Sequence, residues 1–487
     1  MKRIISLFLV FVLLFSLCSL AACGGDEGAK GATSSKSQSK TSSFVSSKNA
    51  SVEIGSSDVG NQGGSNVNSD ASSKNSSDSS LKELALKNSG EITIYAGLPG
   101  KFANTSSWWE DFYQYYKENY NGTVNLISEA TFNDWCEYFI KAFASNTAPD
   151  LIQLYYKNWP SFANRGMVFS IEEMKEIGIA GLDSSYLTDG LELVEDEFAY
   201  GDKHYAFAME SVEPVMIFVN EDLFKKYGVK SPSTYYKEGK WNWQTLELCA
   251  AEISKDTNFD GKNDVYGYTG WDASWIVTAA GGQIITLNKD KSLSVTMEKE
   301  STWQGLVNCN KIYKSKSALY ETVSTTSFAS GKAGMNAGMP KGMYSYLFGK
   351  GSIKKVNFEW SMVPYPLDER TNKSGVRPGE AFAWGVCSQS NNPQGCINFM
   401  IAVREYSKSN PQPDSIKYEE KFTKSQMKMI ESCKSKIDNA TYQGVNNLWN
   451  GQWEFWYRLR GTTVEGAVNY YKPLFEQVVE EEKKLAK

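Results

Sequence analysis

The chain has 487 residues, of which 41% are hydrophobic and 13% aromatic, and its formal net charge is -5. A slightly acidic chain offers no basic surface to nucleic acid, so we expect no nucleic-acid partner. Beyond one N-terminal apolar run, no stretch is long enough to cross a bilayer, so we expect the folded part to be water-soluble.

The N-terminus has the features of a secretory signal. A short basic start, Met1-Lys2-Arg3, precedes an apolar run over residues 4–22 that ends in small residues. The order "LAACG" at residues 20–24 resembles the lipobox of bacterial lipoproteins, in which the cysteine is acylated and becomes the new N-terminus. We therefore expect residues 1–22 to be a signal peptide and Cys23 to be a lipid anchor. A plain signal peptide or a membrane-spanning anchor is the alternative.

The stretch that follows Cys23 is predicted to be a flexible tether. Residues 24–80 are mainly Ser, Gly, Lys, Asn and Asp, with too little apolar material to form a core. Chains of this composition behave as flexible coils. We expect residues 23–85 to be this disordered tether and to hold a folded part of roughly 400 residues away from the membrane.

The folded part begins with alternating strand and helix patterns. The predicted strands are "GEITIYAG" (90–97), "TVNLI" (123–127) and "APDLIQLYY" (148–156). Between them, Ser107 and Glu110 have capping-box spacing at a helix start, and residues 132–143 carry a one-sided apolar stripe. This alternation predicts an α/β fold of mainly parallel sheets flanked by helices.

The same alternation continues towards the C-terminus. Further strands are predicted at "VEPVMIFVN" (212–220), "VYGYTGW" (265–271), "FEWSMVPYP" (358–366) and "AFAWGVCS" (381–388). One helix is expected to end at Gly228. The next has an apolar face made of Leu246, Cys249, Ala250 and Ile253. Residues 423–487 are mostly helical in pattern.

The cysteine and histidine content argues against metal and triad chemistry. Six cysteines follow Cys23, and none of them forms a CxxC pair or a Cys/His cluster. We expect most to be buried free thiols, with a Cys387–Cys396 disulfide as the alternative outside the cell. The single histidine, His204, lies where a turn enters a strand, and no GxSxG motif occurs, so we expect a structural surface histidine.

Seven segments together resemble the family 1 extracellular solute-binding proteins of ABC importers, the group that includes maltose-binding protein. They occur in the order "ASNTAPDLIQL", "FANRGMVFSIEE", "VNEDLFKKYGV", "WNWQTLELCAAEIS", "DVYGY", "FASGKAGM" and "MVPYP". Each segment alone is a weak signal, but the ordered set is specific. The resemblance covers roughly residues 88–480.

This resemblance implies a two-lobe, type II periplasmic-binding-protein-like fold whose lobes close on a ligand around a hinge. By analogy, the chain crosses the hinge near residues 209–211, 363–365 and 404–409. Lobe 1 then comprises residues 86–210 and 365–408, and lobe 2 comprises residues 211–364 and 409–487. The resemblance also implies an ABC permease partner, no catalysis and a place on the extracellular face of the cell membrane. We expect a monomer.

Aromatic side chains recur after the predicted strands, with carboxylates between them. Ligands of open α/β sheets lie beyond the carboxyl ends of the strands, which makes these residues candidate ligand contacts. They are Trp108, Trp109, Tyr155, Tyr156, Glu210, Trp271, Asp272, Trp275, Tyr344, Glu380, Trp449 and Trp453. Aromatic rings cover the apolar faces of sugars and planar polar groups bind the hydroxyls, so the mixture favours a carbohydrate. For each single residue, core packing is the alternative.

The segment "DTNFDGKND" has the spacing of a calcium-binding loop. Its candidate ligands are Asp256, Asn258, Asp260, Lys262 (through its carbonyl) and Asp264, with Gly261 at the sixth position for the sharp turn. The twelfth position is Gly267 instead of a glutamate, so the loop is not an EF-hand. We expect no required cofactor. The spacing indicates either a structural Ca²⁺ ion or a solvated Asx-rich turn.

The main functional hypothesis is a lipid-anchored receptor that binds a sugar or oligosaccharide and delivers it to an ABC permease. The first alternative is a receptor of the same fold for a peptide or a polyamine. The second is a cell-surface glycosidase, which would need two carboxylates flanking the cleft, such as Glu210 and Glu380.

Overall fold

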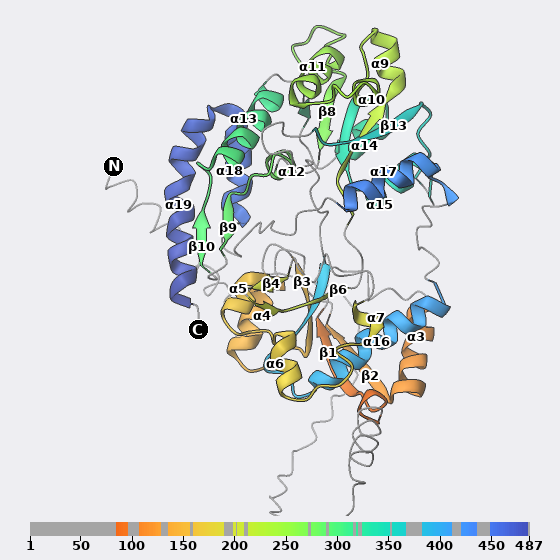
Figure 1. Cartoon of the computed structure of the whole chain (residues 1–487), viewed down its shortest axis with the longest axis vertical. Coiled ribbons are helices and arrows are strands. Elements are labelled where there is room, and N and C mark those ends of the chain that lie inside the picture. Colours follow the sequence, from red (N-terminus) through yellow and green to blue (C-terminus); the bar gives the residue numbers. More distant parts are fainter. Residues whose placement is uncertain are drawn as a thin grey trace, which may run out of the picture. The chain divides into compact units, whose positions relative to one another are not determined.

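The computed structural model describes residues 84–95, 107–127, 135–155, 159–188, 198–200, 202–208, 213–270, 274–288, 292–314, 318–319, 324–350, 353–366, 382–411, 420–435 and 449–485. The predicted signal peptide, Cys23 and the tether up to residue 83 lie outside these residues. Two five-stranded sheets are the centres of the described part, and helices pack against each of them (Figure 1).

The first sheet has the strand order β2-β1-β3-β14-β6. Its strands are β1 (Gly90–Tyr95), β2 (Gly122–Ile127), β3 (Leu151–Tyr155), β6 (Phe207–Ala208) and β14 (Phe382–Val386). Strand β1 is parallel to β2 and β3, whereas β14 is antiparallel to β3 and β6. A strand from late in the chain therefore lies beside the strands of the first half and runs against them.

The second sheet has the order β11-β8-β12-β7-β13. Its strands are β7 (Met216–Asn220), β8 (Tyr266–Gly270), β11 (Ala318–Leu319), β12 (Ala333–Gly338) and β13 (Trp360–Pro364). Strands β11, β8 and β12 are parallel, and β7 is antiparallel to both β12 and β13. Each sheet is therefore mixed, with a parallel part and one strand that runs against its neighbours.

Two helices far apart in the sequence pack together beside the first sheet. They are α3 (Ser107–Tyr120) and α16 (Pro393–Ser409), and their contact includes Phe112, Tyr116 and Phe399. The N-cap residue Asn392 accepts from the amide of Gly395 and donates to the carbonyls of Ser89 and Glu91 at the start of β1, which ties α16 to the sheet. The remaining elements of this part are α4 (Trp135–Ala144), α5 (Trp159–Asn164), α6 (Ile171–Glu176), α7 (Ser185–Thr188), β4 (Ala199–Tyr200) and β5 (Lys203–His204).

In the described part of the chain, more helices accompany the second sheet than the first. They are α9 (Glu221–Tyr227), α10 (Pro232–Lys237), α11 (Trp243–Ile253), α12 (Ser274–Ala279), α13 (Glu300–Lys314), α14 (Ser324–Ala329), α15 (Pro340–Phe348), α17 (Lys424–Lys434), α18 (Trp449–Gly461) and α19 (Val464–Leu485). A small antiparallel ribbon of β9 (Ile285–Leu287) and β10 (Leu293–Val295) lies beside α19 (Figure 1).

Local sequence explains how α9 and α11 begin and end. Gly228 ends α9 with a φ of 67°, a left-handed conformation that glycine adopts without a steric penalty. Asn242 and Thr245 cap the start of α11 reciprocally. The four predicted face residues of α11 are all buried. A Cβ atom on Gly267 would come within 1.8 Å of the Ala250 carbonyl oxygen, so glycine lets β8 lie directly against α11.

The lobe boundaries and hinge crossings stay predictions. The first sheet takes its strands from residues 90–208 and 382–386, and the second from residues 216–364. Residues 209–211 lie outside the described part. The segment at 363–365 includes the end of β13, and the segment at 404–409 is the last part of α16.

The cysteines after Cys23 are all free thiols, and five of the six are buried. The alternative of a Cys387–Cys396 disulfide is therefore wrong for this structure. The prediction of buried thiols holds for all but the half-buried Cys136. Among the described residues, no helix is both long and apolar enough to span a membrane.

Candidate ligand-binding site

Most predicted ligand contacts fall outside the described side chains. Tyr156, Glu210, Trp271, Asp272 and Glu380 lie outside the described residues. Tyr155 belongs to β3, and Trp449 and Trp453 belong to α18, but their side chains are outside the description. The ligand contacts of these eight residues stay predictions.

Trp108 and Trp109 are core residues in this structure. They lie in the first turn of α3 and are only 6% and 5% exposed. The indole N–H of Trp108 donates to the carbonyl of Asn410 at 2.7 Å, and its ring packs edge-on against Tyr406. Both rings belong to the core beside the first sheet, and Trp108 also contacts α16. A ligand contact of either residue stays a prediction.

Trp275 is buried in the first turn of α12, shortly after the carboxyl end of β8. Its Nε1–H group has no acceptor among the described residues. A buried donor without a partner costs about 1–3 kcal/mol, which a ligand oxygen or a water molecule would recover. Tyr344, in contrast, is half-buried on α15 and packs against Phe348 with ring centroids 5.1 Å apart.

The acidic loop at residues 256–264 is held by hydrogen bonds to its own backbone. The carboxylate of Asp264 accepts from the amides of Thr257 and Asn258, and that of Asp256 accepts from Gly261. Hydrogen bonds from the hydroxyl and amide of Thr257 lower the pKa of Asp264. Within the described ranges, no three His, Cys, Asp or Glu side chains are grouped so that they could hold a metal ion. These contacts are those of an Asx-rich turn, and the calcium site stays a prediction.

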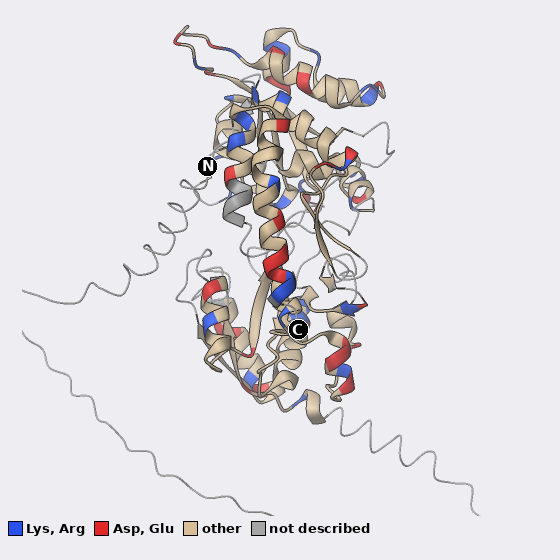
Figure 2. Ribbon diagram, turned by 90° about the vertical axis from the view of Figure 1, so that its left-hand side faces the viewer, with Lys and Arg blue, Asp and Glu red and all other residues tan. Residues whose placement is uncertain are grey.

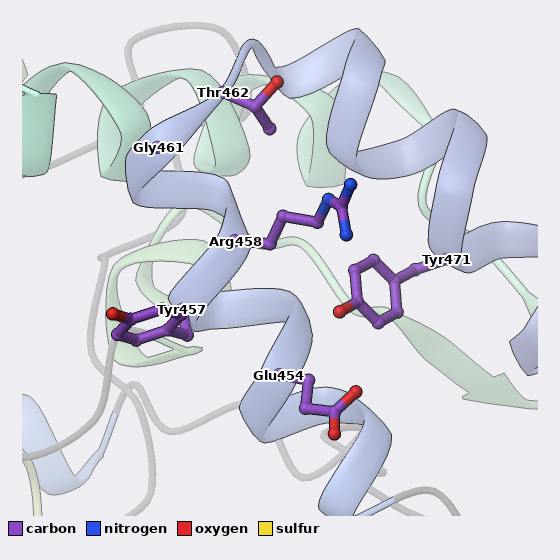
Figure 3. A pocket seen from close by; sticks show the side chains of 6 residues that line it. All are labelled: Glu454, Tyr457, Arg458, Gly461, Thr462 and Tyr471. Carbon is purple, nitrogen blue, oxygen red and sulfur yellow. The ribbon is translucent and has the colours of Figure 1, made fainter.

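A pocket of about 570 Å³ lies on the hairpin that α18 and α19 form (Figure 3). We call it the hairpin pocket, and it is lined by Glu454, Tyr457, Arg458, Gly461, Thr462 and Tyr471. On α18, Phe455, Trp456 and Leu459 turn into the core, so the intervening polar side chains face solvent. The volume is within the range of small-molecule sites, which is roughly 300–1,000 Å³.

None of the residues that line the hairpin pocket was among the predicted ligand contacts. They come from two consecutive helices and do not follow a predicted strand, which is the feature that most of the predicted ligand contacts share. A signal is nevertheless present in "WEFWYRLRG", where Glu454 and Arg458 stand four residues apart on the polar side of an otherwise apolar helix.

Two opposite charges, those of Glu454 and Arg458, lie one helical turn apart along the α18 side of the hairpin pocket. The guanidinium of Arg458 lies over the ring of Tyr470, 4.1 Å from its centroid. Burial raises the pKa of Tyr471, and the nearby charge of Glu454 raises it further, while a hydrogen bond with Arg458 opposes the shift. Figure 3 shows Arg458, Glu454 and Tyr471 with their side chains in the space between the two helices.

The single histidine has a structural partner. The Nδ1 atom of His204 is 3.1 Å from Glu172, and the amide of His204 donates to the same carboxylate. Burial alone would raise the pKa of Glu172, but the hydrogen bonds from His204 outweigh it and the pKa is lowered. The side chain of His204 is 37% exposed, and the structural role predicted for it stays a prediction.

Two mixed sheets flanked by helices, with the last helices returning to the second sheet, define a two-lobe α/β fold. The sequence matches the family of bacterial extracellular solute-binding proteins over residues 100–402, which is more than half of the chain. The chain belongs to this family. A comparison with curated proteins finds no match.

Solved structures of solute-binding proteins share the fold over nearly their whole length. An ABC substrate-binding protein from Listeria monocytogenes in complex with cycloalternan has a TM-score of 0.57 at 18% identity, covering 81% of this chain and 100% of that chain. The galacto-N-biose-/lacto-N-biose I-binding protein of Bifidobacterium longum has a TM-score of 0.59 at 15% identity, covering 81% and 97%. The maltose/maltodextrin-binding domain MalE of Bdellovibrio bacteriovorus, bound to maltotriose, has 0.55 at 16%, covering 80% and 100%. The predicted type II fold is confirmed.

Proposed function

We propose that the protein is the extracellular receptor of an ABC importer and that it binds a sugar or oligosaccharide between its lobes. The observation that carries this proposal is the family match, joined to a fold shared over nearly full length with solute-binding proteins that were solved with sugars. The high aromatic content, with 14 Trp, 27 Tyr and 24 Phe, suits a sugar site.

The receptor needs no chemistry of its own, and we propose that it is not an enzyme. A ligand that contacts both lobes stabilises the closed conformation, and the permease can then recognise that conformation. Trp275 is the described residue best suited to contact the ligand, because its buried N–H group lacks an acceptor near the end of β8. A sugar hydroxyl is a suitable acceptor for an indole N–H.

We further propose that Cys23 carries the lipid anchor and that the Ser-rich stretch after it is the tether. The support is the "LAACG" order at the end of the apolar run and the polar composition that follows. On this proposal the receptor is a monomer on the extracellular face of the cell membrane.

A thermal-shift screen of the purified protein against mono- and oligosaccharides, amines and peptides tests the main proposal. A ligand that binds only the folded state raises the melting temperature by mass action. We expect one class of glycan to raise it, and we expect that glycan to be recovered intact. A rise with amines or peptides alone would overturn the sugar assignment, and a cleaved glycan would favour the glycosidase alternative.

A pair of matched variants tests the role of Trp275. Trp275→Phe keeps a ring in place but removes the N–H donor, so the rise in melting temperature caused by the glycan should be smaller. Trp243→Phe is the control, because the Nε1–H group of Trp243 on α11 is also buried without an acceptor in the described part. Equal shifts in both variants would show that Trp275 does not contact the ligand.

A further inference from the structure

The hairpin pocket lies on the side of α18 that faces away from the core of the second sheet. Phe455 and Leu459 are 0% exposed and Trp456 is 3% exposed, and all three pack in that core. They therefore separate the pocket from the sheet and from the ends of its strands. A ligand in the hairpin pocket would not occupy the inter-lobe site proposed above.

Arg458 presents a free hydrogen-bonding edge to this pocket. Its guanidinium carbon, Cζ, lies over the ring of Tyr470, 4.1 Å from the ring centroid. One N–H group of Arg458 meets the hydroxyl of Tyr471, and the other N–H groups can form a bidentate pair with a carboxylate. Among the described residues, no carboxylate forms an ion pair with Arg458.

Glu454 lies one helical turn before Arg458 and is also unpaired within the described part of the chain. Glutamate and arginine four residues apart commonly form an ion pair along a helix. Here Arg458 instead lies against Tyr470 and Tyr471 of α19, which keeps the two charges apart (Figure 3). The pocket therefore offers a cation and an anion at separate positions, with the Tyr471 side chain beside them.

We propose that the hairpin pocket is a second binding site, and that it takes a zwitterionic ligand of the class of short peptides with free termini. The carboxylate of the ligand pairs with the fork of Arg458, and its ammonium group pairs with Glu454. The ring of Tyr471 gives the ammonium an additional cation–π contact. Two full and opposite charges match a zwitterion better than a neutral sugar, whose hydroxyl groups need no formal charge.

Calorimetric titration of the purified protein with the dipeptide alanyl-alanine tests this proposal. The expected result is binding that weakens by at least about tenfold when the peptide carries an N-acetyl group or a C-terminal amide. Arg458→Met should weaken binding of the free dipeptide to a similar extent and remove the preference for a free carboxylate. Glu454→Gln should remove the preference for a free ammonium group. Arg458→Lys should bind at an intermediate level, since it keeps the charge but loses the fork.

Glu465→Gln is the control for net charge, because Glu465 lies in the first turn of α19 and does not line the pocket. This variant should bind the dipeptide like the unmodified protein. Absence of binding at millimolar dipeptide would overturn the proposal. Binding that is unchanged in Arg458→Met and Glu454→Gln would also overturn it, since it would place the peptide at another site, such as the one between the lobes.

Discussion

Glu482 on α19 is the one charged side chain among the buried described residues, with 1% of its surface exposed. The guanidinium of Arg165 donates to its carboxylate at 2.8 Å, and the hydroxyl of Ser161 donates at 3.1 Å. A buried carboxylate is tolerated only where such partners replace the water that it loses. The residues that hold Glu482 lie in and just after α5, beside the first sheet.

We predict that Glu482→Gln lowers the free energy of unfolding by about 3 kcal/mol, because it leaves the charge of Arg165 uncompensated in a largely buried place. This value is at the lower end of the loss in stability usually caused by breaking a buried ion pair, because the side chain of Arg165 is 18% exposed. Urea unfolding measures the change. Glu481→Gln is the control, because Glu481 is an exposed neighbour on the same helix. Equal losses in the two variants would contradict the prediction.

The buried thiols predict a loss of stability at alkaline pH. Burial raises the pKa of Cys249 to about 12 and that of Cys387 to about 11. A thiol in an unfolded chain has a pKa of about 8.5. Between about pH 8.5 and 10 the unfolded chain therefore loses thiol protons that the folded chain keeps, so the free energy of unfolding falls as the pH rises. Each thiol contributes about 1.4 kcal/mol per pH unit in that window.

Urea unfolding at pH 8, 9 and 10 under reducing conditions measures this slope. Cys249→Ala should make the slope shallower, because one of the shifted groups is gone. The same substitution creates a small cavity, so the slope and not the absolute stability is the relevant quantity. A slope that Cys249→Ala leaves unchanged would show that the thiol does not stay protonated in the folded state.

At the scale of elements, the acidic loop between α11 and β8 carries the calcium proposal. The Oδ1 atom of Asp256 is inaccessible to solvent and has no hydrogen-bond partner in the described part of the chain. Phe259 in the same loop is 91% exposed, so the loop gains little from packing. We propose that a Ca²⁺ ion recruits the side chains of this loop, as the alternate spacing of its oxygens indicates.

The expected result is a rise in melting temperature when Ca²⁺ is added to protein treated with a chelator, with a smaller effect of Mg²⁺. Asp256→Asn should reduce the rise that Ca²⁺ causes, whatever its effect on the protein without the ion. Glu252→Gln, on α11 outside the loop, is the control for charge. If Ca²⁺ changes nothing at millimolar concentration, the loop is an Asx-rich turn held by its own hydrogen bonds.

At the scale of the whole molecule, α19 connects parts of the chain that are far apart in sequence. Its residues Val468 and Phe475 pack in the core of the second sheet, and Glu482 near its end reaches Arg165 beside the first sheet. Figure 2 shows the charged residues near the end of this helix. The last helix of the chain therefore links the two sheets, and the Glu482 variants test that link.

The proposed anchor is also a property of the whole chain. We predict that Cys23→Ala abolishes the acylation of the protein and moves it from the membrane fraction to the medium, because the thiol is the site of lipid attachment. Metabolic labelling with a fatty acid, followed by fractionation, measures both effects. Cys18→Ala is the control, since this residue leaves with the predicted signal peptide. A Cys23→Ala protein that stays with the membrane would favour the membrane-spanning alternative.

Much of the fold could be predicted from local patterns. Helix α11 occupies most of its predicted segment with its four apolar residues buried, and α9 ends at Gly228. Apolar periodicity and helix caps depend on neighbours within about one helical turn, and the sequence contains them directly. The order of the segments was enough to identify the solute-binding family, which the match over residues 100–402 bears out.

The surroundings of the candidate site residues could be predicted less well from the sequence. Trp108 and Trp275 both follow predicted strands. The ring of Trp108 is nevertheless covered by α16, a helix far away in the sequence. The indole N–H of Trp108 donates to the carbonyl of Asn410, which is 302 residues away in the chain. Trp275 is also buried but keeps an N–H group without an acceptor in the described part. Position after a strand does not distinguish these two environments.

The sequence by itself therefore determined the elements, the buried faces of helices such as α11, and the family. Only the tertiary structure decided that β7 and β14 run against their neighbours, that Trp108 is covered, and that Glu482 pairs with Arg165. The physical reason is the range of the interactions. Periodicity and capping act between near neighbours, whereas strand direction, ring burial and charge pairing depend on segments that meet only when the chain folds.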